Sequence, residues 1–357
     1  MKVGILGTRG IPNHYGGFEQ WAEQLSRGLI NMGCEVLVYN SHFHPYKKKE
    51  LNGVQIVHKW DPKSIGLTSQ FIYDFLCIVH ARKQKFDVII QLGYTTSSVW
   101  GWMLPKGVRV IYNMDGMEWR RTKYKGLIKS FLKYAENLAV NNSDVLIADS
   151  KPIKQYLDSK YKINAEFIAY PAEIFEEPDV AVLEKYRLKQ KNYLLLIARF
   201  QPDNNFEIII EGVLKSNSKK SLLIIGDNKN SYGRYLKNKF NDSRIVFIGK
   251  VYNKPELDNL RYFSYLYFHG HSVGGTNPSL LEAMATQCVI CAHNNEFNKS
   301  VLGSDAFYFN NIEDITVLIN NVDNNNEKQS WISNNLDYLR SNNKMDDLIN
   351  KYYNLLK

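Results

Sequence analysis

The sequence predicts an α/β protein built from two doubly wound parallel-sheet domains. Short runs rich in Val, Ile and Leu alternate with helical patterns along most of the 357 residues. Several of these runs are continuously apolar, as is typical of strands buried on both faces of a parallel sheet. The alternation stops once, at the polar stretch 171–192, and then begins again. Two domains joined by a linker account for both observations.

The predicted elements follow this division. The first domain is expected over 1–170, the linker over 171–192 and the second domain over 193–340, followed by a C-terminal helix, 341–357, that can pack back on the first domain. Strands are expected in the first domain at 2–7, 35–40, 54–60, 87–93, 109–115, 144–150 and 165–170. In the second domain they are expected at 193–200, 221–227, 244–250, 265–270, 288–294 and 306–309, and most of the chain from 310 onward is predicted to be helical.

Composition and charge restrict the class of protein. With 44% hydrophobic and 23% charged residues, the chain is expected to be globular throughout. The net charge of +9 favours polyanionic partners such as anionic lipid or phosphorylated ligands. No recognised nucleic-acid-binding motif accompanies the charge, so we expect no nucleic-acid partner. The N-terminal apolar run is too short for a signal peptide or a membrane span, so we expect a cytoplasmic protein that can lie on the inner face of the plasma membrane.

A basic segment at 119–140 has two interpretations. Six basic residues surround an apolar set at roughly helical spacing. The basic residues are Arg120, Arg121, Lys123, Lys125, Lys129 and Lys133, and the apolar ones are Leu127, Ile128, Phe131, Leu132 and Ala135. A helix of this kind can lie on an anionic membrane surface, or it can be a solvated helix whose apolar stripe faces the core.

The four cysteines do not form a disulfide framework in a chain of this length. Cys288 and Cys291 have the CxxC spacing, but they lie in an apolar, strand-like run without a second Cys pair. We therefore expect them to be buried packing residues, and no metal site is expected.

The glycine-rich stretch GTRGIPNHYGGFE (7–19) follows the first predicted strand and leads into a helix beginning near Phe18. Gly16 and Gly17 would let backbone N–H groups approach an anion at the helix N-terminus, which indicates a diphosphate cradle. The alternative is a tight turn between strand and helix.

A rival interpretation rests on three earlier glycines. Gly4, Gly7 and Gly10 have the GxxGxxG spacing of short-chain dehydrogenases and sugar epimerases, and Tyr156 with Lys160 makes a YxxxK pair downstream of Ser143. That class uses a nicotinamide cofactor. The second strand, however, ends in VYNSHF and lacks the acidic residue expected to hold the adenosine ribose.

The stretch YFHGHSVGGTNPSLLEAMATQ (267–287) is the most specific in the chain. Asn277 is expected to cap a helix that starts at Pro278, after a glycine-rich loop. The backbone amides of Gly275, Thr276 and Asn277 would then face a phosphate. Glu282 lies about one turn further along, where its carboxylate could accept hydrogen bonds from ribose hydroxyls.

With YGGFE, ARFQPDNNFE, IIGD and GGTNPSLLEAMA in this order, the whole chain resembles the family-four retaining glycosyltransferases of the GT-B fold. GTRGIPNHYGGFE, NMDGMEWRR and GHSVGGTNPSLLEAM resemble more narrowly a bacterial rhamnosyltransferase subgroup of capsule and surface-polysaccharide assembly. The resemblance implies two Rossmann-like domains facing each other across a cleft, with Gly16 and Gly17 toward the donor diphosphate. It implies a metal-independent transferase without a cofactor, whose donor is a dTDP- or UDP-linked sugar, for the subgroup dTDP-L-rhamnose. The implied acceptor is a lipid-linked surface glycan.

Two positions depart from the family pattern. Glu282 matches the second Glu of the family's Glu-x7-Glu pair, but Gly274 stands at the first. Arg199 matches the expected phosphate-binding Arg, while Asn204 stands where a Lys is expected. The resemblance assigns catalytic roles to Arg199, Glu282 and Asp115. A non-catalytic nucleotide-sugar-binding relative is the alternative.

The remaining candidate residues are two acids that could bind the acceptor and four histidines. Asp115 and Glu118 follow a predicted strand and could bind acceptor hydroxyls; the alternatives are a turn residue for Asp115 and a surface ion pair for Glu118. His42 and His44 are interpreted as solvated loop residues, the alternative being that they line the same cleft as the acceptor residues. His269 and His271 are candidates for contact with the donor sugar, with packing beneath the loop as the alternative for both; His271 is retained as a donor-binding residue.

Overall fold

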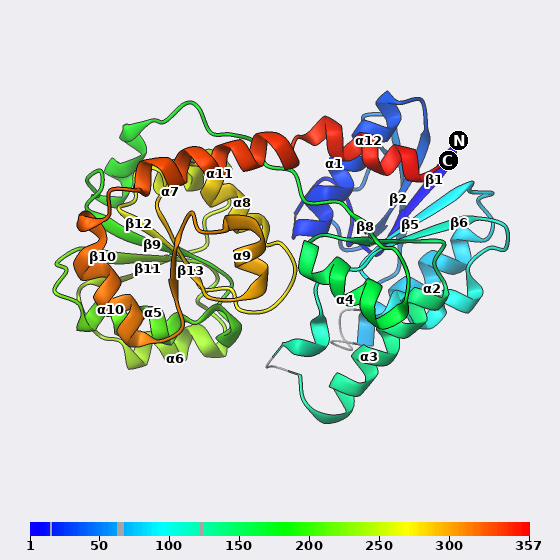
Figure 1. The fold of residues 1–357 in the computed structure, drawn as a ribbon. Coiled ribbons are helices and arrows are strands. Elements are labelled where there is room, and N and C mark those ends of the chain that lie inside the picture. Colours follow the sequence, from blue (N-terminus) through cyan, green and yellow to red (C-terminus); the bar gives the residue numbers. More distant parts are fainter. Residues whose placement is uncertain (15, 63–67, 122–123) are drawn as a thin grey trace. The chain divides into compact units, whose positions relative to one another are not determined.

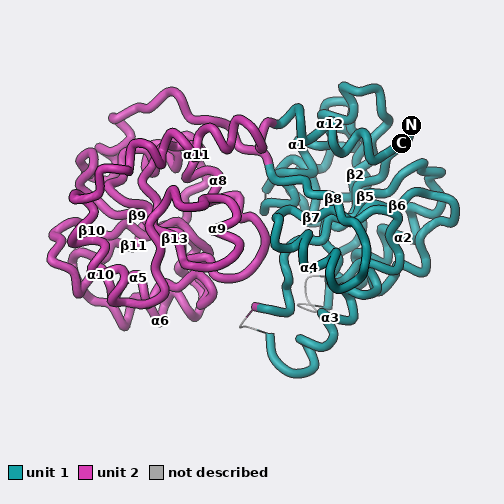
Figure 2. The backbone as a smooth tube through the Cα atoms, in the orientation of Figure 1, with its two compact units in different colours: residues 1–120, 124–170, 345–357 teal, residues 121–123, 171–344 magenta. Residues whose placement is uncertain are grey.

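The computed structural model describes all residues except 15, 63–67 and 122–123. The chain forms two compact units, coloured separately in Figure 2. Unit 1 contains 1–120, 124–170 and the C-terminal 345–357, and unit 2 contains 171–344 together with Arg121. Each unit is described by itself below.

Unit 1 is built on an eight-stranded sheet with the order β3-β4-β2-β1-β5-β6-β7-β8. All described pairings are parallel except the β3–β4 hairpin at one edge. The strands are β1 (Lys2–Leu6), β2 (Glu35–Ser41), β3 (Glu50–Leu51), β4 (Val54–Lys59), β5 (Val88–Leu92), β6 (Arg109–Asn113), β7 (Val145–Ala148) and β8 (Glu166–Phe167). Every residue of β5 is buried, as its continuous apolar run predicts.

The helices of unit 1 pack on this sheet (Figure 1). They are α1 (Gly17–Asn31), α2 (Ser69–Ala81), α3 (Gly126–Asn141), α4 (Lys151–Tyr161) and α12 (Met345–Leu355), with the 3₁₀ helices η2 (Ser97–Met103) and η3 (Glu118–Arg120). The first helix buries Trp21, Leu25 and Leu29, the predicted apolar face. On α12, Tyr352 packs against Trp21 at 5.3 Å between ring centroids, and its hydroxyl accepts a hydrogen bond from Asn113 Nδ2 at 2.8 Å.

Unit 2 is built on a six-stranded, fully parallel sheet with the order β11-β10-β9-β12-β13-β14. Its strands are β9 (Tyr193–Ile197), β10 (Ser221–Ile225), β11 (Ile245–Gly249), β12 (Leu266–His269), β13 (Ile290–His293) and β14 (Phe307–Phe309). Its helices are α5 (Phe206–Lys215), α6 (Ser231–Lys239), α7 (Lys254–Tyr262), α8 (Pro278–Ala285), α9 (Glu296–Leu302), α10 (Ile312–Asn321) and α11 (Lys328–Asn342), with the 3₁₀ helices η4 (Val180–Tyr186), η5 (Pro202–Asn204) and η6 (Val322–Asn324).

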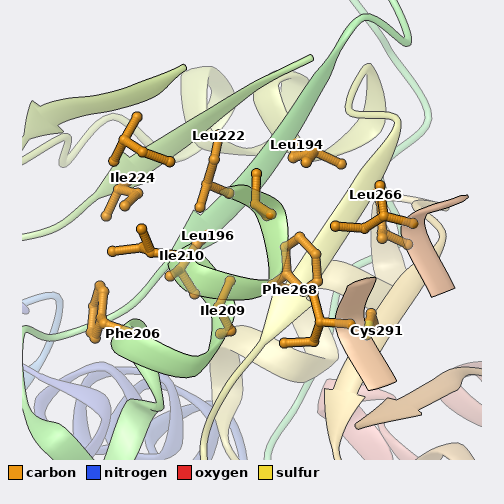
Figure 3. Packing of buried hydrophobic residues seen from close by; sticks show 14 of the residues in the cluster. Leu194, Leu196, Phe206, Ile209, Ile210, Leu222, Ile224, Leu266, Phe268 and Cys291 are labelled. Atoms are coloured by element: carbon orange, nitrogen blue, oxygen red, sulfur yellow. The ribbon is translucent and has the colours of Figure 1, made fainter. Parts of the chain in front are cut away.

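The core of unit 2 lies between this sheet and the helices α5, α6 and α10. Phe206, Ile209 and Ile210 of α5 pack against Leu194, Leu196 and other side chains of the central strands (Figure 3). Burial of this apolar surface is the main favourable contribution to the stability of the unit. It also fixes the carboxyl ends of β9 and β12, where the candidate site lies.

Two predicted elements differ from the structure. The continuous helix expected at 119–140 is wrong, because η3 ends at Arg120 and α3 begins only at Gly126. Lys125, directly before α3, has extended backbone angles, and Gly126 has a φ of +53°. The strand expected at 165–170 is only Glu166–Phe167, because β8 is a short edge strand that pairs with β7 alone.

Candidate active site

The loops after β9 and β12 lie together in unit 2, because these strands are neighbours and parallel strands end at the same sheet edge. Asn205 Nδ2 donates to the carbonyl of Gly270 at 2.7 Å, and the N–H of Ser272 donates to the carbonyl of Asp203 at 3.0 Å. A Cβ atom at residue 270 would lie 2.1 Å from the carbonyl oxygen of Asn204, so only glycine fits there.

The predicted helix start at Asn277 and Pro278 is confirmed. Asn277 Oδ1 accepts a hydrogen bond from the N–H of Ser279 at 2.9 Å, and Pro278 is the first residue of α8. The first turn of α8 contains no acidic residue. Gly275 and buried Thr276 lie in the loop directly before this helix N-terminus, which carries the positive end of the helix dipole.

The side chain of Asn204 fixes the tautomer of His271. Asn204 Nδ2 donates to the carbonyl of Arg199 at 2.7 Å, so its Oδ1 is the atom that faces His271. His271 Nδ1 lies 2.9 Å from this oxygen and must therefore donate to it. The other ring nitrogen, Nε2, then has a lone pair and acts as a hydrogen-bond acceptor.

The surroundings keep His271 uncharged. Burial, followed by the positive charges of Arg121 and Arg199, lowers the pKa of His271 to about 3. Arg199 itself is exposed, directly after β9. Nε2 lies 3.1 Å from where a Cβ atom of residue 274 would be, and Gly274 has a φ of +125°, which disfavours any other residue. The two departures from the family pattern, Asn204 and Gly274, therefore both adjoin His271.

Two asparagines that the sequence analysis did not single out hold the backbone of His271. Asn295 Nδ2 and Asn298 Nδ2 donate to the carbonyl of His271 at 2.9 and 3.0 Å. Asn295 also caps α9. The cap motif of α9 is visible in the sequence, but its link to His271 depends on the folded sheet.

Glu282 has a partner that the sequence analysis also missed. Its carboxylate accepts a hydrogen bond from the guanidinium of Arg261, a fully buried residue of α7 that also donates to Asp258 Oδ1 at 3.0 Å. The side chain of Glu282 is 28% exposed. Arg261 therefore fixes the carboxylate while leaving part of it accessible.

His269, Cys288 and Cys291 are packing residues of the same region. His269 is buried at the end of β12, and within the described part of the chain its Nε2 has no hydrogen-bond partner. Burial lowers the pKa of His269 well below its usual value. Both cysteines are buried and not in disulfides, as predicted.

The side chain of Glu19 lies at the first glycine-rich loop of unit 1. Gly16 caps α1, and a Cβ atom there would lie 3.0 Å from Glu19 Oε2. The buried Glu19 accepts hydrogen bonds from the N–H of Arg9 at 2.8 Å and from Thr8 Oγ1 at 3.4 Å. The carboxyl group of Glu19 thus lies beside Gly16. Tyr15, within the same motif, lies outside the described residues.

A further polar cluster of unit 1 was not predicted. Arg9 forms an ion pair with Asp61, a fully buried residue that also accepts a hydrogen bond from Ser41 Oγ at 2.9 Å. On α2, burial raises the pKa of Asp74 to about 6. These residues are distant in sequence, so no local pattern marks them.

His42 and His44 both form hydrogen bonds in unit 1, and one of them is not solvated as expected. His44 is buried, with Nε2 at 3.0 Å from the carbonyl of Pro12, so its interpretation as a solvated residue is wrong. His42 is half-buried, and its Nδ1 accepts a hydrogen bond from the N–H of Asp61 at 2.8 Å. Both rings hold loops of unit 1 in place.

The candidate acceptor residues follow β6. Asp115 has a φ of +42°, and its N–H donates to Asn113 Oδ1 at 3.3 Å. Glu118 is only 9% exposed, so it is not the surface residue that the ion-pair alternative assumes. Both carboxylates contribute to raising the pKa of Tyr94, after burial, and so lie near that ring.

The YxxxK pair, Tyr156 and Lys160, does not have the environment expected of a catalytic base and its partner. Tyr156 OH donates to Glu136 Oε1 at 2.7 Å, and Lys160 Nζ lies 2.7 Å from the same oxygen. Burial and Glu136 raise the pKa of Tyr156. The pair is part of the packing between α3 and α4.

Comparison with known families divides the chain at nearly the same place as the two units. Residues 1–173 match a domain of unknown function, DUF1972, and residues 182–336 match the family "Glycosyl transferases group 1". We call residues 182–336 the group 1 domain after this match. No curated protein sequence matches the chain.

Solved structures similar to the whole chain show its fold. Sucrose-phosphate synthase from Thermosynechococcus elongatus matches with a TM-score of 0.83 at 14% identity, covering 99% of this chain and 98% of that one. HepE from Anabaena in complex with UDP-glucose matches with a TM-score of 0.75 at 12% identity, covering 100% and 99%. Trehalose 6-phosphate synthase from Burkholderia multivorans matches with a TM-score of 0.69 at 11% identity, covering 100% and 98%. The predicted GT-B fold is confirmed.

The group 1 domain contains seven of the predicted site residues, and the DUF1972 region contains the other four. The first set is Arg199, Asn204, His271, Gly275, Thr276, Asn277 and Glu282, and the second is Gly16, Gly17, Asp115 and Glu118. Among the described residues, no group of three or more His, Cys, Asp or Glu side chains is placed to hold a metal ion. No helix of the described chain combines the length and hydropathy needed to cross a bilayer.

Proposed function

We propose that the protein is a retaining glycosyltransferase that transfers a sugar from a nucleotide-diphosphate donor bound at the group 1 domain. The observation that carries the proposal is the site at the N-terminus of α8, which brings together a helix dipole, an exposed arginine and an uncharged His271. HepE, which has the same fold, is described in complexes with UDP and with UDP-glucose.

Each part of the site has a role in this reaction. The amides of Gly275, Thr276 and Asn277 and the guanidinium of Arg199 stabilise the negative charge of the departing diphosphate. Glu282, fixed by Arg261, accepts hydrogen bonds from the ribose hydroxyls. The glycosidic C–O bond to the diphosphate breaks as the acceptor oxygen bonds to the same face of the sugar, and the departing phosphate oxygen takes the acceptor proton. This chemistry requires neither a metal nor another cofactor.

The tautomer of His271 supports a contact with the donor sugar. Its Nε2 is a neutral acceptor beside Gly274, whose φ of +125° disfavours a residue with a carboxylate side chain. A neutral imidazole binds one sugar hydroxyl without adding charge next to the diphosphate. We propose dTDP-L-rhamnose as the donor on the resemblance to the rhamnosyltransferase subgroup. A 6-deoxy sugar, which has fewer hydroxyls to satisfy, is compatible with Gly274.

The acceptor is proposed to be a lipid-linked surface glycan held by Asp115 and Glu118 of unit 1. Gly16 and Gly17 are proposed to contribute amides to the donor diphosphate. The protein is then expected to work in the cytoplasm, in contact with the inner face of the plasma membrane.

Thermal denaturation with dTDP, UDP, GDP, NAD and NADP, each with and without EDTA, tests the proposal, because a ligand that binds the native state raises the melting temperature. We expect stabilisation by dTDP or UDP that EDTA does not change. Stabilisation by NAD or NADP alone would overturn the proposal in favour of a dehydrogenase. Turnover of dTDP-L-rhamnose with retained anomeric configuration, followed by NMR, separates a transferase from a relative that only binds the nucleotide sugar.

A further inference from the structure

Two adjacent arginines at the end of η3 have different environments. Arg120 is the last residue of η3 and belongs to unit 1, and its side chain is exposed. Arg121 belongs to unit 2 and is only 8% exposed. The next two residues, which include Lys123 of the predicted basic segment, lie outside the described residues. Two residues of the same type, next to each other in the chain, are therefore available for comparison.

The side chain of Arg120 lies on the surface of unit 1. Its guanidinium carbon is 5.5 Å from the ring centroid of Trp119, and Lys133 Nζ is 4.8 Å from the same ring. The indole N–H of Trp119 donates to the buried Glu136 at 3.0 Å, which fixes the ring. Cation–π contacts of this kind are weak at exposed sites. Arg120 is therefore a surface cation.

The guanidinium of Arg121 lies at the loop before α8. Its Nη2 atom is 3.7 Å from where a Cβ atom of residue 274 would be, and His271 Nε2 is 3.1 Å from the same point. The amides of 275–277, which lead into the helix, follow directly in the chain. A cation and a neutral acceptor nitrogen thus both lie beside Gly274, near the positive end of the α8 dipole.

The charge of Arg121 acts on this loop more strongly than that of Arg199. After burial, Arg121 makes the larger contribution to lowering the pKa of His271, and Arg199 makes the next. Charges shielded from water interact more strongly than exposed ones, and Arg121 is buried whereas Arg199 is exposed. Two cations of unit 2 therefore act on the same ring, one from shortly after β9 and one from directly after η3.

A nucleotide diphosphate needs more positive charge than one arginine and a helix end provide. Both of its phosphoryl groups are negatively charged, and further charge develops on the outer one as the glycosidic bond breaks. A helix N-terminus contributes only about half an elementary charge. Asn204, which stands where the family pattern has a lysine, is neutral. A guanidinium is well suited to fill the gap, because its fork of N–H groups binds two phosphate oxygens at once.

We propose that Arg121 binds the donor diphosphate at the α8 site, as a second cation beside Arg199. Arg121 in this way supplies the charge that Asn204 does not. The lack of an acid at Gly274 fits this role, because a carboxylate there would compete with the phosphate for the guanidinium. The inference rests on the proposed function, since it names a further binding residue for the same donor.

Titration calorimetry of three variants with dTDP, or with UDP if that nucleotide binds more tightly, tests the proposal. R121Q should bind about 10- to 100-fold more weakly, the range expected for loss of a charged hydrogen-bond partner. R121K should lose about threefold to tenfold, because it keeps the charge without the fork. R120Q is the matched control. It changes the neighbouring surface arginine and should bind within about twofold of the unchanged protein.

The corresponding nucleoside, thymidine or uridine, separates a phosphate contact from a packing role. Because Arg121 is buried, its replacement can also lower the melting temperature. The nucleoside has no phosphate and should bind R121Q and the unchanged protein equally in ligand-observed NMR. Equal loss of affinity for the nucleoside and its diphosphate would mean that Arg121 serves only the packing of unit 2, and the proposal would be wrong. If R121Q does not fold, R121K supports the same comparison.

Salt and the donor sugar give two further readouts. Raising the salt concentration should weaken diphosphate binding more in the unchanged protein than in R121Q, because the variant has lost one screened attraction. Equal salt dependence would contradict the proposal. R121Q should lose affinity for dTDP and for dTDP-L-rhamnose by the same factor. A loss confined to the nucleotide sugar would assign Arg121 to the sugar and overturn the diphosphate role.

Failure of this inference differs from failure of the proposed function. If the unchanged protein binds neither dTDP nor UDP, the proposed function is wrong and the diphosphate role of Arg121 is wrong with it. If the unchanged protein binds one of them and R121Q binds it as tightly as R120Q does, only the role of Arg121 is wrong.

Discussion

Two strand–loop–helix segments of this chain are alike in sequence and differ in charge. The loop between β1 and α1 ends with Gly16, directly before Gly17 begins the helix, and the loop between β12 and α8 contains Gly274 and Gly275. In the first, the carboxylate of Glu19 lies beside the helix N-terminus. In the second, the cap is the neutral Asn277, and the first turn has no acidic residue.

This difference in charge determines whether each helix N-terminus can bind a further anion. A carboxylate near the positive end of a helix satisfies the dipole and repels a further anion. At α8 the nearby side chains are instead the cation Arg199 and the uncharged His271, so an incoming diphosphate meets no negative charge in that first turn. Glycine spacing alone does not distinguish an anion site from a helix that already has its counter-charge.

The largest effect is expected for Arg199→Ala, which removes the cation from the α8 site. Turnover with a dTDP-linked sugar should fall by about 100-fold, a size usual for loss of one charged or hydrogen-bonding group that stabilises a developing anion. The melting temperature should stay the same because the side chain is exposed. Steady-state kinetics beside a thermal melt check both. A variant as active as the unchanged protein would remove Arg199 from the mechanism.

Replacing one glycine in each of the two loops should have different effects: weaker donor binding for one variant and lower stability for the other. At residue 274 a Cβ atom would lie 3.1 Å from His271 Nε2, so Gly274→Ala should weaken binding of dTDP-L-rhamnose by about tenfold or more while affecting dTDP less. At residue 10, with a φ of +123°, a Cβ atom would lie 2.3 Å from Cγ of buried Asn40. Gly10→Ala should therefore destabilise the fold by about 1–3 kcal/mol.

Calorimetric titration and denaturant unfolding of both variants separate the two effects. If Gly274→Ala lost the nucleotide and the nucleotide sugar equally, the loop would be misfolded and the sugar contact of His271 would lose its support.

The glycine positions and the apolar strands are the part of the fold that sequence could predict. Strands such as β5 and β9 are buried runs, so their residues identify them without help from the rest of the chain. The separation of η3 from α3 was missed because Trp119 turns back over α3 to reach Glu136, a contact between residues 17 positions apart.

Partners brought in by other elements were the unpredictable part of the site. Arg261 reaches Glu282 from α7, and Asn295 and Asn298 reach His271 from the start of α9. No local periodicity encodes such pairs, because they depend on which strands become neighbours in the sheet. The candidate residues on the α8 loop could be predicted, but the side chains that fix their tautomer and orientation could not.

Glu282→Gln tests how far Arg261 matters. Affinity for dTDP should fall by about 1–3 kcal/mol, because the ribose hydroxyls lose a charged acceptor. The melting temperature should also fall, since the buried Arg261 loses one of its two carboxylate partners. Unchanged nucleotide affinity together with a lower melting temperature would leave Glu282 a purely structural ion-pair partner.

The depressed pKa of His271 predicts a pH dependence of stability. The folded protein keeps this ring neutral down to about pH 3, whereas an unfolded histidine takes up a proton near its ordinary pKa of 6.5. The stabilisation linked to this group is therefore complete above pH 6.5 and is lost as the pH falls toward 3, at up to about 1.4 kcal/mol per pH unit. His271→Gln should flatten the difference between unfolding free energies measured at pH 7 and pH 5. Parallel curves for the two proteins would contradict the assignment.

The smallest effect, and the most informative about the first loop, is expected for Glu19→Gln. The substituted side chain keeps an oxygen to accept from the N–H of Arg9 and from Thr8 Oγ1, so the fold should change little. If Gly16 and Gly17 contribute amides to the donor diphosphate, removing the adjacent negative charge should strengthen dTDP binding by about 0.3–1 kcal/mol at low salt, and less at high salt. Titration calorimetry at two salt concentrations measures this. An affinity that does not change at either concentration would mean that the α1 N-terminus takes no part in binding the diphosphate. The glycines of the first loop would then serve only the packing of the chain, as Gly10 does against Asn40.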